Sequence, residues 1–284
     1  MDFSGGVAAV TGGGSGIGEA LCRALAGAGM QVAVIDVNGD RAAAVAERIG
    51  NRARPYPLDV TDRQALDEQA AGIERQLGSV NLLCANAGVV MPFGSVIERN
   101  DADWQYVLSV NLFGVIHTVD AFIEQLRRNA GNAHILVTSS MGGLVIGGHI
   151  PLGPYTVSKY ACVGYCEELR SALSEAGIGV SMLAPGVVNT EIMHNSSETR
   201  PGALGSQPPP PRQRGYVSPR LAAVAVTPAQ TAETALEGMR NNRFYIPTHI
   251  DDAGRLKDHY DAILTEMSGQ GHKGGIRGVE ELNG

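Results

Sequence analysis

The feature that most constrains the fold is an alternation of short apolar runs with longer amphipathic runs, continuing through residue 190. The short runs have the length of buried strands, and the longer ones repeat their apolar residues with helical spacing. Neighbouring parallel strands need a crossover connection, which is usually a helix. The alternation therefore predicts an α/β protein with one doubly wound parallel sheet and helices on both faces.

The expected strands cover 7–10, 31–35, 54–58, 80–85, 134–138, 180–183 and 243–247, and the expected helices cover 16–29, 40–49, 61–77, 103–128, 154–176 and 227–240. Ligands of such sheets bind outside the carboxyl ends of the strands. We therefore expect the residues that follow these ends to gather along one edge. They are Gly12, Asp36, Asp59, Asn86, Ser140 and Pro185.

A glycine-rich turn, Thr11–Gly18, joins the first strand to the first helix. Glycine lets a ligand approach the backbone closely, and the free N–H groups of a helix N-terminus bind phosphate. Asp36 ends the next strand, where its carboxylate can accept hydrogen bonds from the adenosine ribose and would repel a 2′-phosphate. This context predicts a dinucleotide site that prefers NAD to NADP.

Tyr155 and Lys159 lie four residues apart within an expected helix, so they share one helix face. There the ammonium can stabilise the phenolate form of the tyrosine. Together with the glycine-rich turn, this pair indicates an enzyme that transfers a hydride while Tyr155 transfers the proton.

The 284 residues carry a net charge of −7 and no basic block, which disfavours nucleic acid and anionic membranes as partners. No run of 18 apolar residues or signal-like segment is present, so we expect neither a membrane span nor export. The four cysteines include no CxxC pair, and we interpret Cys162 and Cys166 as buried thiols rather than metal ligands. We expect a reduced, cytoplasmic protein without a metal.

Several motifs together resemble the classical short-chain dehydrogenase/reductase family over residues 5–250. They are Thr11-Gly12 with Gly16 and Gly18, Asp59-Val60, Asn86-Ala87-Gly88, Asn111, Ser140, Tyr155 with Lys159, and Pro185-Gly186 with Val188 and Thr190. The resemblance implies a single Rossmann-type, seven-stranded parallel sheet. It also implies a homotetramer or homodimer.

The resemblance assigns catalytic roles to Asn111, Ser140, Tyr155 and Lys159. Tyr155 would be the general acid/base, and Lys159 would also hold the nicotinamide ribose. Ser140, rather than Ser139, would hydrogen-bond the substrate oxygen, and Asn111 would hold a water of the proton relay. An ordinary helix asparagine that bonds to backbone is the alternative for Asn111.

The predicted cofactor-binding residues follow from the same motifs. They are Gly12, Ser15, Gly16, Ile17, Gly18, Asp36, Asp59, Val60, Asn86, Ala87, Gly88, Tyr155, Lys159, Pro185, Gly186, Val188 and Thr190. Helix capping is an alternative or additional role for Asp59 and Thr190.

Ser140 and Tyr155 stand further apart than the family pattern, and the extra residues lie in an apolar, glycine-rich loop over 144–152. Apolar residues near the expected nicotinamide position, without clustered Lys or Arg, favour a lipophilic alcohol or ketone. The substrate candidates are Met91, Phe93, Leu144, Ile146, His149, Leu152 and Met193. A solvated loop position is the alternative for His149.

We expect residues 1–250 to form one domain for cofactor and catalysis, with a lid over 191–227 and a partly flexible extension over 251–284. The predicted activity is NAD-dependent interconversion of a lipophilic secondary alcohol, aromatic alcohols included, and its ketone. Short stretches near Ser140, Tyr155 and 241–247 are similar to family members that oxidise benzylic alcohols of aryl ethers. A dihydrodiol dehydrogenase, an NADP-type ketone reductase and a non-catalytic cofactor-binding regulator are the alternatives.

Overall fold

A computed structural model describes residues 1–146, 151–205, 223–249 and 253–270. Clustering of contacts divides the chain into two compact units, Met1–His249 and Ile250–Gly284. The first unit contains the sheet and the candidate site. In the second unit the described element is the helix α10, Ala253–Gln270, whose exposed apolar residues Tyr260, Ile263, Leu264 and Met267 recur with helical spacing.

The sheet has seven parallel strands in the order β3-β2-β1-β4-β5-β6-β7. Their bounds are β1 Val7–Thr11, β2 Gln31–Asp36, β3 Ala53–Pro57, β4 Val80–Ala85, β5 Ala133–Thr138, β6 Ile178–Ala184 and β7 Tyr245–Pro247. The chain runs outward from β1 to β3 and then returns to β4 on the other side of β1. The carboxyl ends of β1 and β4 therefore flank the point where the strand order reverses, the usual ligand position of such sheets.

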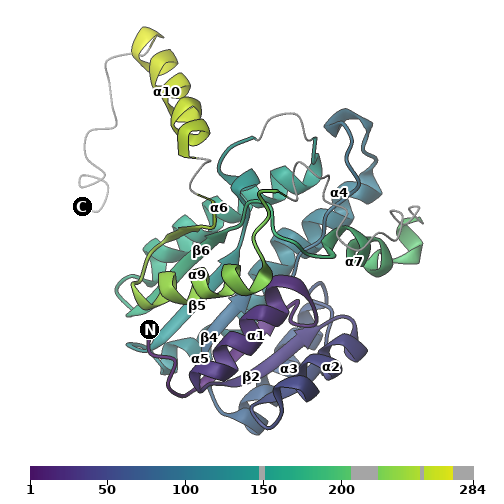
Figure 1. The fold of residues 1–284 in the computed structure, drawn as a ribbon, viewed down its shortest axis with the longest axis vertical. Coiled ribbons are helices and arrows are strands. Elements are labelled where there is room, and N and C mark those ends of the chain that lie inside the picture. The colour runs from purple at the N-terminus through teal and green to yellow at the C-terminus, as the bar shows by residue number, and fades with distance from the viewer. Residues whose placement is uncertain (147–150, 206–222, 250–252, 271–284) are drawn as a thin grey trace, which may run out of the picture. The chain divides into compact units, whose positions relative to one another are not determined.

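The helices that cover the sheet are α1 Gly16–Ala28, α2 Gly39–Ile49, α3 Arg63–Leu77, α4 Asp101–Leu108, α5 Gly114–Arg128, α6 Pro154–Leu173 and α9 Pro228–Arg240. A further helix, α7 Ile192–Thr199, follows β6 in the chain. Helix α1 packs against α2 and α9, whereas α3 packs against α5 and α4 against α6. These two groups cover opposite faces of the sheet (Figure 1). The fold is the predicted Rossmann-type doubly wound sheet with helices on both faces.

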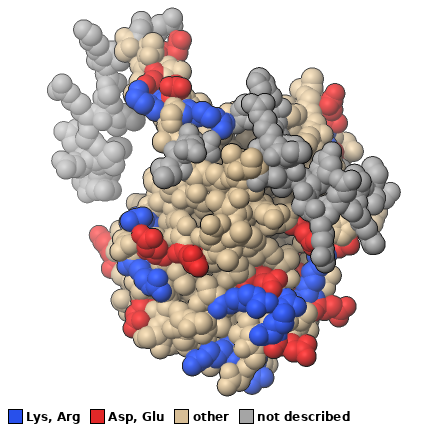
Figure 2. All heavy atoms as spheres, in the orientation of Figure 1, with Lys and Arg blue, Asp and Glu red and all other residues tan. Residues whose placement is uncertain are grey.

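The core follows from the continuous apolar runs of the central strands. Every residue of β1, β4 and β5 is buried, as expected for parallel strands covered on both faces. Leu21, Leu25 and Cys22 of α1 are fully buried against this sheet. On the face in Figure 2, acidic and basic side chains are interspersed and form no patch of one sign.

One described helical run, residues 101–128, contains an 18-residue window with a mean hydropathy of 1.5, so it could cross a membrane by length and composition alone. A core helix passes the same test. Here α5 packs against β4 and α3, and Val115, Val119, Phe122 and Leu126 are buried. Burial within the protein therefore accounts for the apolar composition of this run.

The same run contains a π-helical turn, Ser109–Phe113, between α4 and α5. The pattern predicted one continuous helix over 103–128, and the structure has a widened turn in its middle. A π-turn leaves backbone carbonyls without their usual helical partner and is often found at functional sites. Asn111 lies at the centre of this turn.

Candidate active site

The described residues at the carboxyl ends of the strands enclose a cavity of about 280 Å³. Every residue predicted to bind the cofactor lines it. Those on the adenosine side of the predicted site include Asp36, Asp59 and Val60, and those on the catalytic side include Tyr155, Lys159 and Thr190. The topology thus brings together positions that are far apart in sequence, and their roles as ligand contacts stay a prediction.

The glycine-rich turn has the close backbone approach that a dinucleotide needs. A Cβ atom at Gly18 would lie 2.0 Å from the carbonyl oxygen of Gly12, and Gly12 has a φ of +63°. Ser15, the N-cap of α1, makes no side-chain hydrogen bond to the first turn of the helix. The first N–H groups of α1 are therefore available to an anion, as a pyrophosphate requires.

Asp36 lies at the end of β2 and is held by backbone donors. Gly14 N donates to its Oδ2 and Asn38 N donates to its Oδ1, both at 2.9 Å. Each carboxylate oxygen can accept further hydrogen bonds. Because the side chain also lines the cavity, the residues present fit an adenosine ribose at this position.

The last residues of β1 and β5 are hydrogen-bonded to the loop that follows β4. Thr11 Oγ1 accepts from Asn86 N and Ala87 N at 3.0 and 3.1 Å, and Thr138 Oγ1 donates to Asn86 Oδ1 at 3.0 Å. Asn86 also donates from Nδ2 to Thr11 O at 3.0 Å. Asn86 therefore fixes three strand ends around the cavity, in addition to lining it.

Tyr155 and Lys159 are one turn apart in α6, which begins with Pro154 at its first position. Lys159 is 3% exposed, and its Nζ donates to Thr138 O at 2.8 Å. Nζ lies 5.6 Å from the centre of the Tyr155 ring. A buried ammonium whose described hydrogen bond uses one of its three protons can still donate to a ribose or to a water.

The side chain of Asn111 is occupied by structural hydrogen bonds. Its Oδ1 accepts from Val89 N at 2.7 Å, and its Nδ2 donates to Val89 O at 2.9 Å and Ser158 Oγ at 3.0 Å. Its backbone oxygen, in the π-turn, accepts from Cys162 Sγ at 3.0 Å. This pattern matches the backbone-bonding alternative for the side chain, so a water relay at Asn111 stays a prediction.

Two neighbouring serines follow β5 and differ in their surroundings. Ser139 is buried and its Oγ donates to Lys159 O at 2.9 Å, so its hydroxyl joins the strand end to α6. Ser140 is partly exposed, and its Oγ accepts from Gly142 N at 3.0 Å and donates to Pro185 O at 3.5 Å. Ser140 is the more accessible of the two, but Ser139 lines the cavity and Ser140 does not. The Oγ of Ser140 bonds to the cavity-lining Pro185, and its catalytic role stays a prediction.

The six described substrate candidates do not line the 280 Å³ cavity. Met91 is buried in an apolar cluster on which Tyr155 packs, and Leu144 is also buried. Phe93 is 55% exposed and Ile146 is 70% exposed. Leu152 and Met193 are partly exposed, and His149 lies outside the described residues. Their assignment to the substrate stays a prediction.

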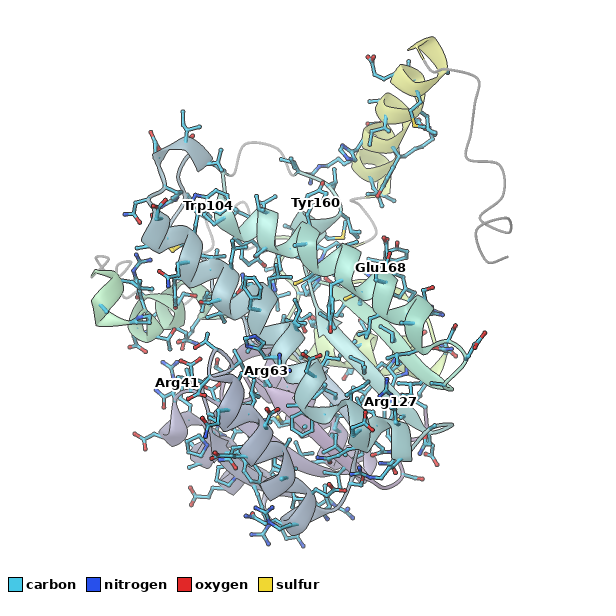
Figure 3. All side chains as sticks on the ribbon, turned by 180° about the vertical axis from the view of Figure 1, so that it is seen from behind. Arg41, Arg63, Trp104, Arg127, Tyr160 and Glu168 are labelled. Carbon is cyan, nitrogen blue, oxygen red and sulfur yellow. The ribbon has the colours of Figure 1, made fainter. Side chains whose placement is uncertain are left out.

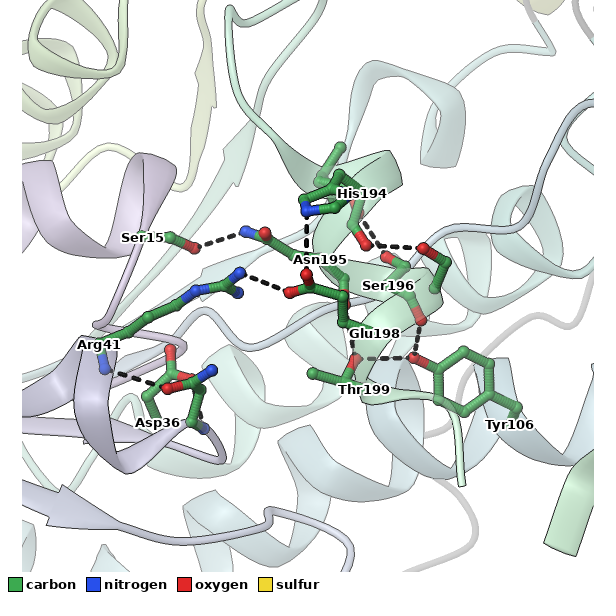
Figure 4. A network of polar contacts seen from close by, with 12 residues as sticks. Ser15, Asp36, Arg41, Tyr106, His194, Asn195, Ser196, Glu198 and Thr199 are labelled. Atoms are coloured by element: carbon green, nitrogen blue, oxygen red, sulfur yellow. Dashed lines mark hydrogen bonds and ion pairs between the residues drawn. The ribbon is translucent and has the colours of Figure 1, made fainter. Parts of the chain in front are cut away.

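Helix α7 lies in the first part of the segment expected to be a lid, 191–227. Its sequence is mainly polar, so no apolar periodicity predicted a helix there. Its residues Asn195, Ser196 and Thr199 line the cavity. Tyr106 of α4 donates to Ser196 O at 2.7 Å, and Asn195 Nδ2 donates to Ser15 Oγ at 3.1 Å (Figure 4). These contacts join residues that are 90 and 180 positions apart, so no local pattern could have identified them.

The sheet order, the glycine-rich turn and the acid after β2 define a dinucleotide-binding α/β protein. The short chain dehydrogenase family profile matches residues 6–201. The chain belongs to the short-chain dehydrogenase family, whose members are oxidoreductases with a nicotinamide cofactor.

Similarities to individual proteins, in sequence and in structure, are consistent with this family. The chain is 29% identical to a C alpha-dehydrogenase of Sphingobium sp. strain SYK-6, covering 94% of this chain and 88% of that one. It is 31% identical to 1-deoxy-11-beta-hydroxypentalenate dehydrogenase of Streptomyces avermitilis, covering 92% and 91%. The crystal structure of a short-chain dehydrogenase/reductase from Burkholderia phymatum in complex with NAD is similar with a TM-score of 0.83, at 30% identity and 94% and 96% coverage.

Proposed function

We propose that this protein is an NAD-dependent oxidoreductase that interconverts a lipophilic secondary alcohol and its ketone. The observation that carries the proposal is one cavity lined by Tyr155, Lys159, Asp36 and the glycine-rich turn. A proton-transferring pair and a dinucleotide cradle in the same cavity are what hydride transfer from an alcohol requires.

The negative charges on the adenosine side of the cavity support the preference for NAD. Asp36 and Asp59 line the adenosine side of the cavity, and a 2′-phosphate would bring further negative charge beside them. A ribose with both hydroxyls free would instead donate hydrogen bonds to Asp36. The similar Burkholderia phymatum protein was crystallised with NAD.

In the proposed mechanism, Tyr155 accepts the hydroxyl proton of the alcohol and returns it in the reverse direction. Lys159 stabilises the phenolate electrostatically, and Ser140 donates a hydrogen bond to the substrate oxygen as charge develops there. Bound NAD supplies the hydride acceptor. The buried position of Lys159 strengthens its effect, because charges interact more strongly away from water.

An apolar cluster beside Tyr155 supports a lipophilic substrate. Val89, Met91, Tyr106 and Val107 form a buried cluster, and Tyr155 packs against it. Two relatives are named as a C alpha-dehydrogenase and a dehydrogenase of a hydroxypentalenate. We include an aromatic secondary alcohol, such as a benzylic one, within the proposed class.

An alcohol panel with NAD tests this proposal. It compares 1-arylalkanols, cyclic secondary alcohols, cis-dihydrodiols and phosphorylated alcohols by kcat/KM for NADH formation. We expect the uncharged arylalkanols or cyclic alcohols to be the best substrates. A preference for phosphorylated alcohols would contradict the lipophilic class, and a preference for dihydrodiols would replace it with a dihydrodiol dehydrogenase.

We also propose a cytoplasmic protein that assembles from two or four copies. The four cysteines are buried and free, as in a protein that does not depend on disulfides. Native mass spectrometry of the purified protein measures the assembly directly, and a monomer would contradict this part of the proposal.

A further inference from the structure

Arg41 is the cationic residue at the adenosine end of the cavity. Among the described residues that line the cavity, the cations are Arg41 and Lys159, and Lys159 belongs to the catalytic pair. Arg41 lies in the first turn of α2, beside Asp36: a Cβ built at Gly14 would be 2.8 Å from both Arg41 Cβ and Asp36 Oδ2. A guanidinium near the ribose-binding acid would ordinarily favour a 2′-phosphate, because it can bind phosphate through two parallel hydrogen bonds.

The charge of Arg41 is engaged by Glu198 of α7, from the other side of the cavity. Arg41 Nη2 lies 2.6 Å from Glu198 Oε2. The second oxygen of Glu198 lies 2.9 Å from His194 Nε2 (Figure 4). Figure 3 shows Arg41 on the side of the molecule where α7 lies. The guanidinium is thus turned toward α7.

The position of Glu198 is set by contacts that do not involve Arg41. Helix α7 is held on one side by Tyr106, which donates to Ser196 O and lies 2.9 Å from Thr199 Oγ1. Arg200, directly after the helix, forms an ion pair with Asp103 at 2.9 Å, with side chains 4% and 7% exposed. These buried contacts keep the carboxylate of Glu198 beside α2.

We propose that Glu198 is a second cofactor-specificity residue, which holds Arg41 away from a 2′-phosphate and adds its own negative charge there. This inference rests on the proposed preference for NAD. A 2′-phosphate placed near Arg41 would have to displace Glu198 and would face two carboxylates, Asp36 and Glu198. The cost is electrostatic, so it decreases when salt is added.

Two nucleotides isolate the effect of the 2′-phosphate without any turnover. Adenosine 2′,5′-bisphosphate and 5′-AMP differ in that group alone, and calorimetry gives the Kd of each. The variants are Asp36→Ala, Glu198→Gln, the double variant, and the double variant with Arg41→Ala. The matched control is Glu237→Gln in the Asp36→Ala background, because Glu237 also pairs with an arginine, Arg243, and the side chains are 63% and 60% exposed.

In the Asp36→Ala background, we expect Glu198→Gln to tighten the bisphosphate about fivefold, the scale of one solvent-exposed charge contact, while 5′-AMP changes by less than about twofold. Arg41→Ala should remove most of this gain, and Glu237→Gln should give none. The inference is overturned if Glu198→Gln does not tighten the bisphosphate, or if the whole gain survives Arg41→Ala. Tighter binding of the bisphosphate than of 5′-AMP to the wild type would instead overturn the proposed NAD preference itself.

Discussion

Replacement of His134 by glutamine should flatten the pH dependence of stability between pH 8 and pH 5. His134 lies in β5 and is 2% exposed, and its Nε2 is 2.8 Å from Ser181 Oγ. Ser181 donates its proton to Arg243 O at 2.6 Å. Nε2 must therefore donate to Ser181, which fits a neutral imidazole.

Burial lowers the pKa of His134 from 6.5 to about 3, with smaller contributions from the N-terminal ammonium and Arg170. Below pH 6.5 the unfolded chain binds a proton at this residue that the folded protein does not. The free energy of unfolding is therefore highest above pH 6.5 and decreases as the pH falls toward 3. Each pH unit below 6.5 lowers the free energy of unfolding by about 1.4 kcal/mol, so the neutral His134 lowers it by about 2 kcal/mol at pH 5.

Thermal unfolding at pH 8, 7, 6 and 5 measures this difference. With about 2–4 °C per kcal/mol for a domain of this size, the wild type should lose about 4–8 °C more than His134→Gln between pH 8 and pH 5. Comparison of each protein with its own value at pH 8 removes the packing cost of the substitution. Equal losses in the two proteins would refute the neutral, buried histidine.

Further predictions follow from three other parts of the structure. Gly18→Ala should weaken NAD binding more than about tenfold, because its Cβ would lie 2.0 Å from Gly12 O; calorimetry that finds an unchanged Kd would contradict the cradle. The four cysteines should resist iodoacetamide in the native protein, because burial raises their pKa values, that of Cys84 to about 12; mass spectrometry should find alkylation only after unfolding. Tyr106→Phe removes a hydrogen bond to Ser196 O, so it should lower the free energy of unfolding in urea by about 1 kcal/mol. The same variant should raise KM for NAD. Unchanged values of both quantities would mean that α7 does not depend on this contact.

The parallel sheet with helices on both faces was predictable from sequence, because its strands and crossover helices follow local patterns. Continuous apolar runs indicate buried parallel strands, and β4 was predicted with the bounds that the structure has. The cavity was predictable for the same reason, because the topology places every carboxyl end at one edge. The positions of Gly12, Asp36 and Tyr155 follow from the strand ends and from one helix face.

Contacts between distant segments could not be predicted. Helix α7 consists mainly of polar residues, and Tyr106 and Arg200 anchor it from outside. In the sequence, Arg41 is indistinguishable from an ordinary surface residue of a helix, and only the structure shows its ion pair with Glu198. The π-turn around Asn111 leaves the apolar repeat intact, so periodicity predicted an uninterrupted helix.

The central claim is that Tyr155 transfers the substrate proton in a cavity that also binds NAD. Tyr155→Phe removes the hydroxyl and keeps the ring that packs on the apolar cluster. With the best alcohol of the panel, kcat should fall about 100-fold or more, while the Kd for NAD from calorimetry changes by less than about threefold. A variant that keeps the wild-type kcat would contradict the account.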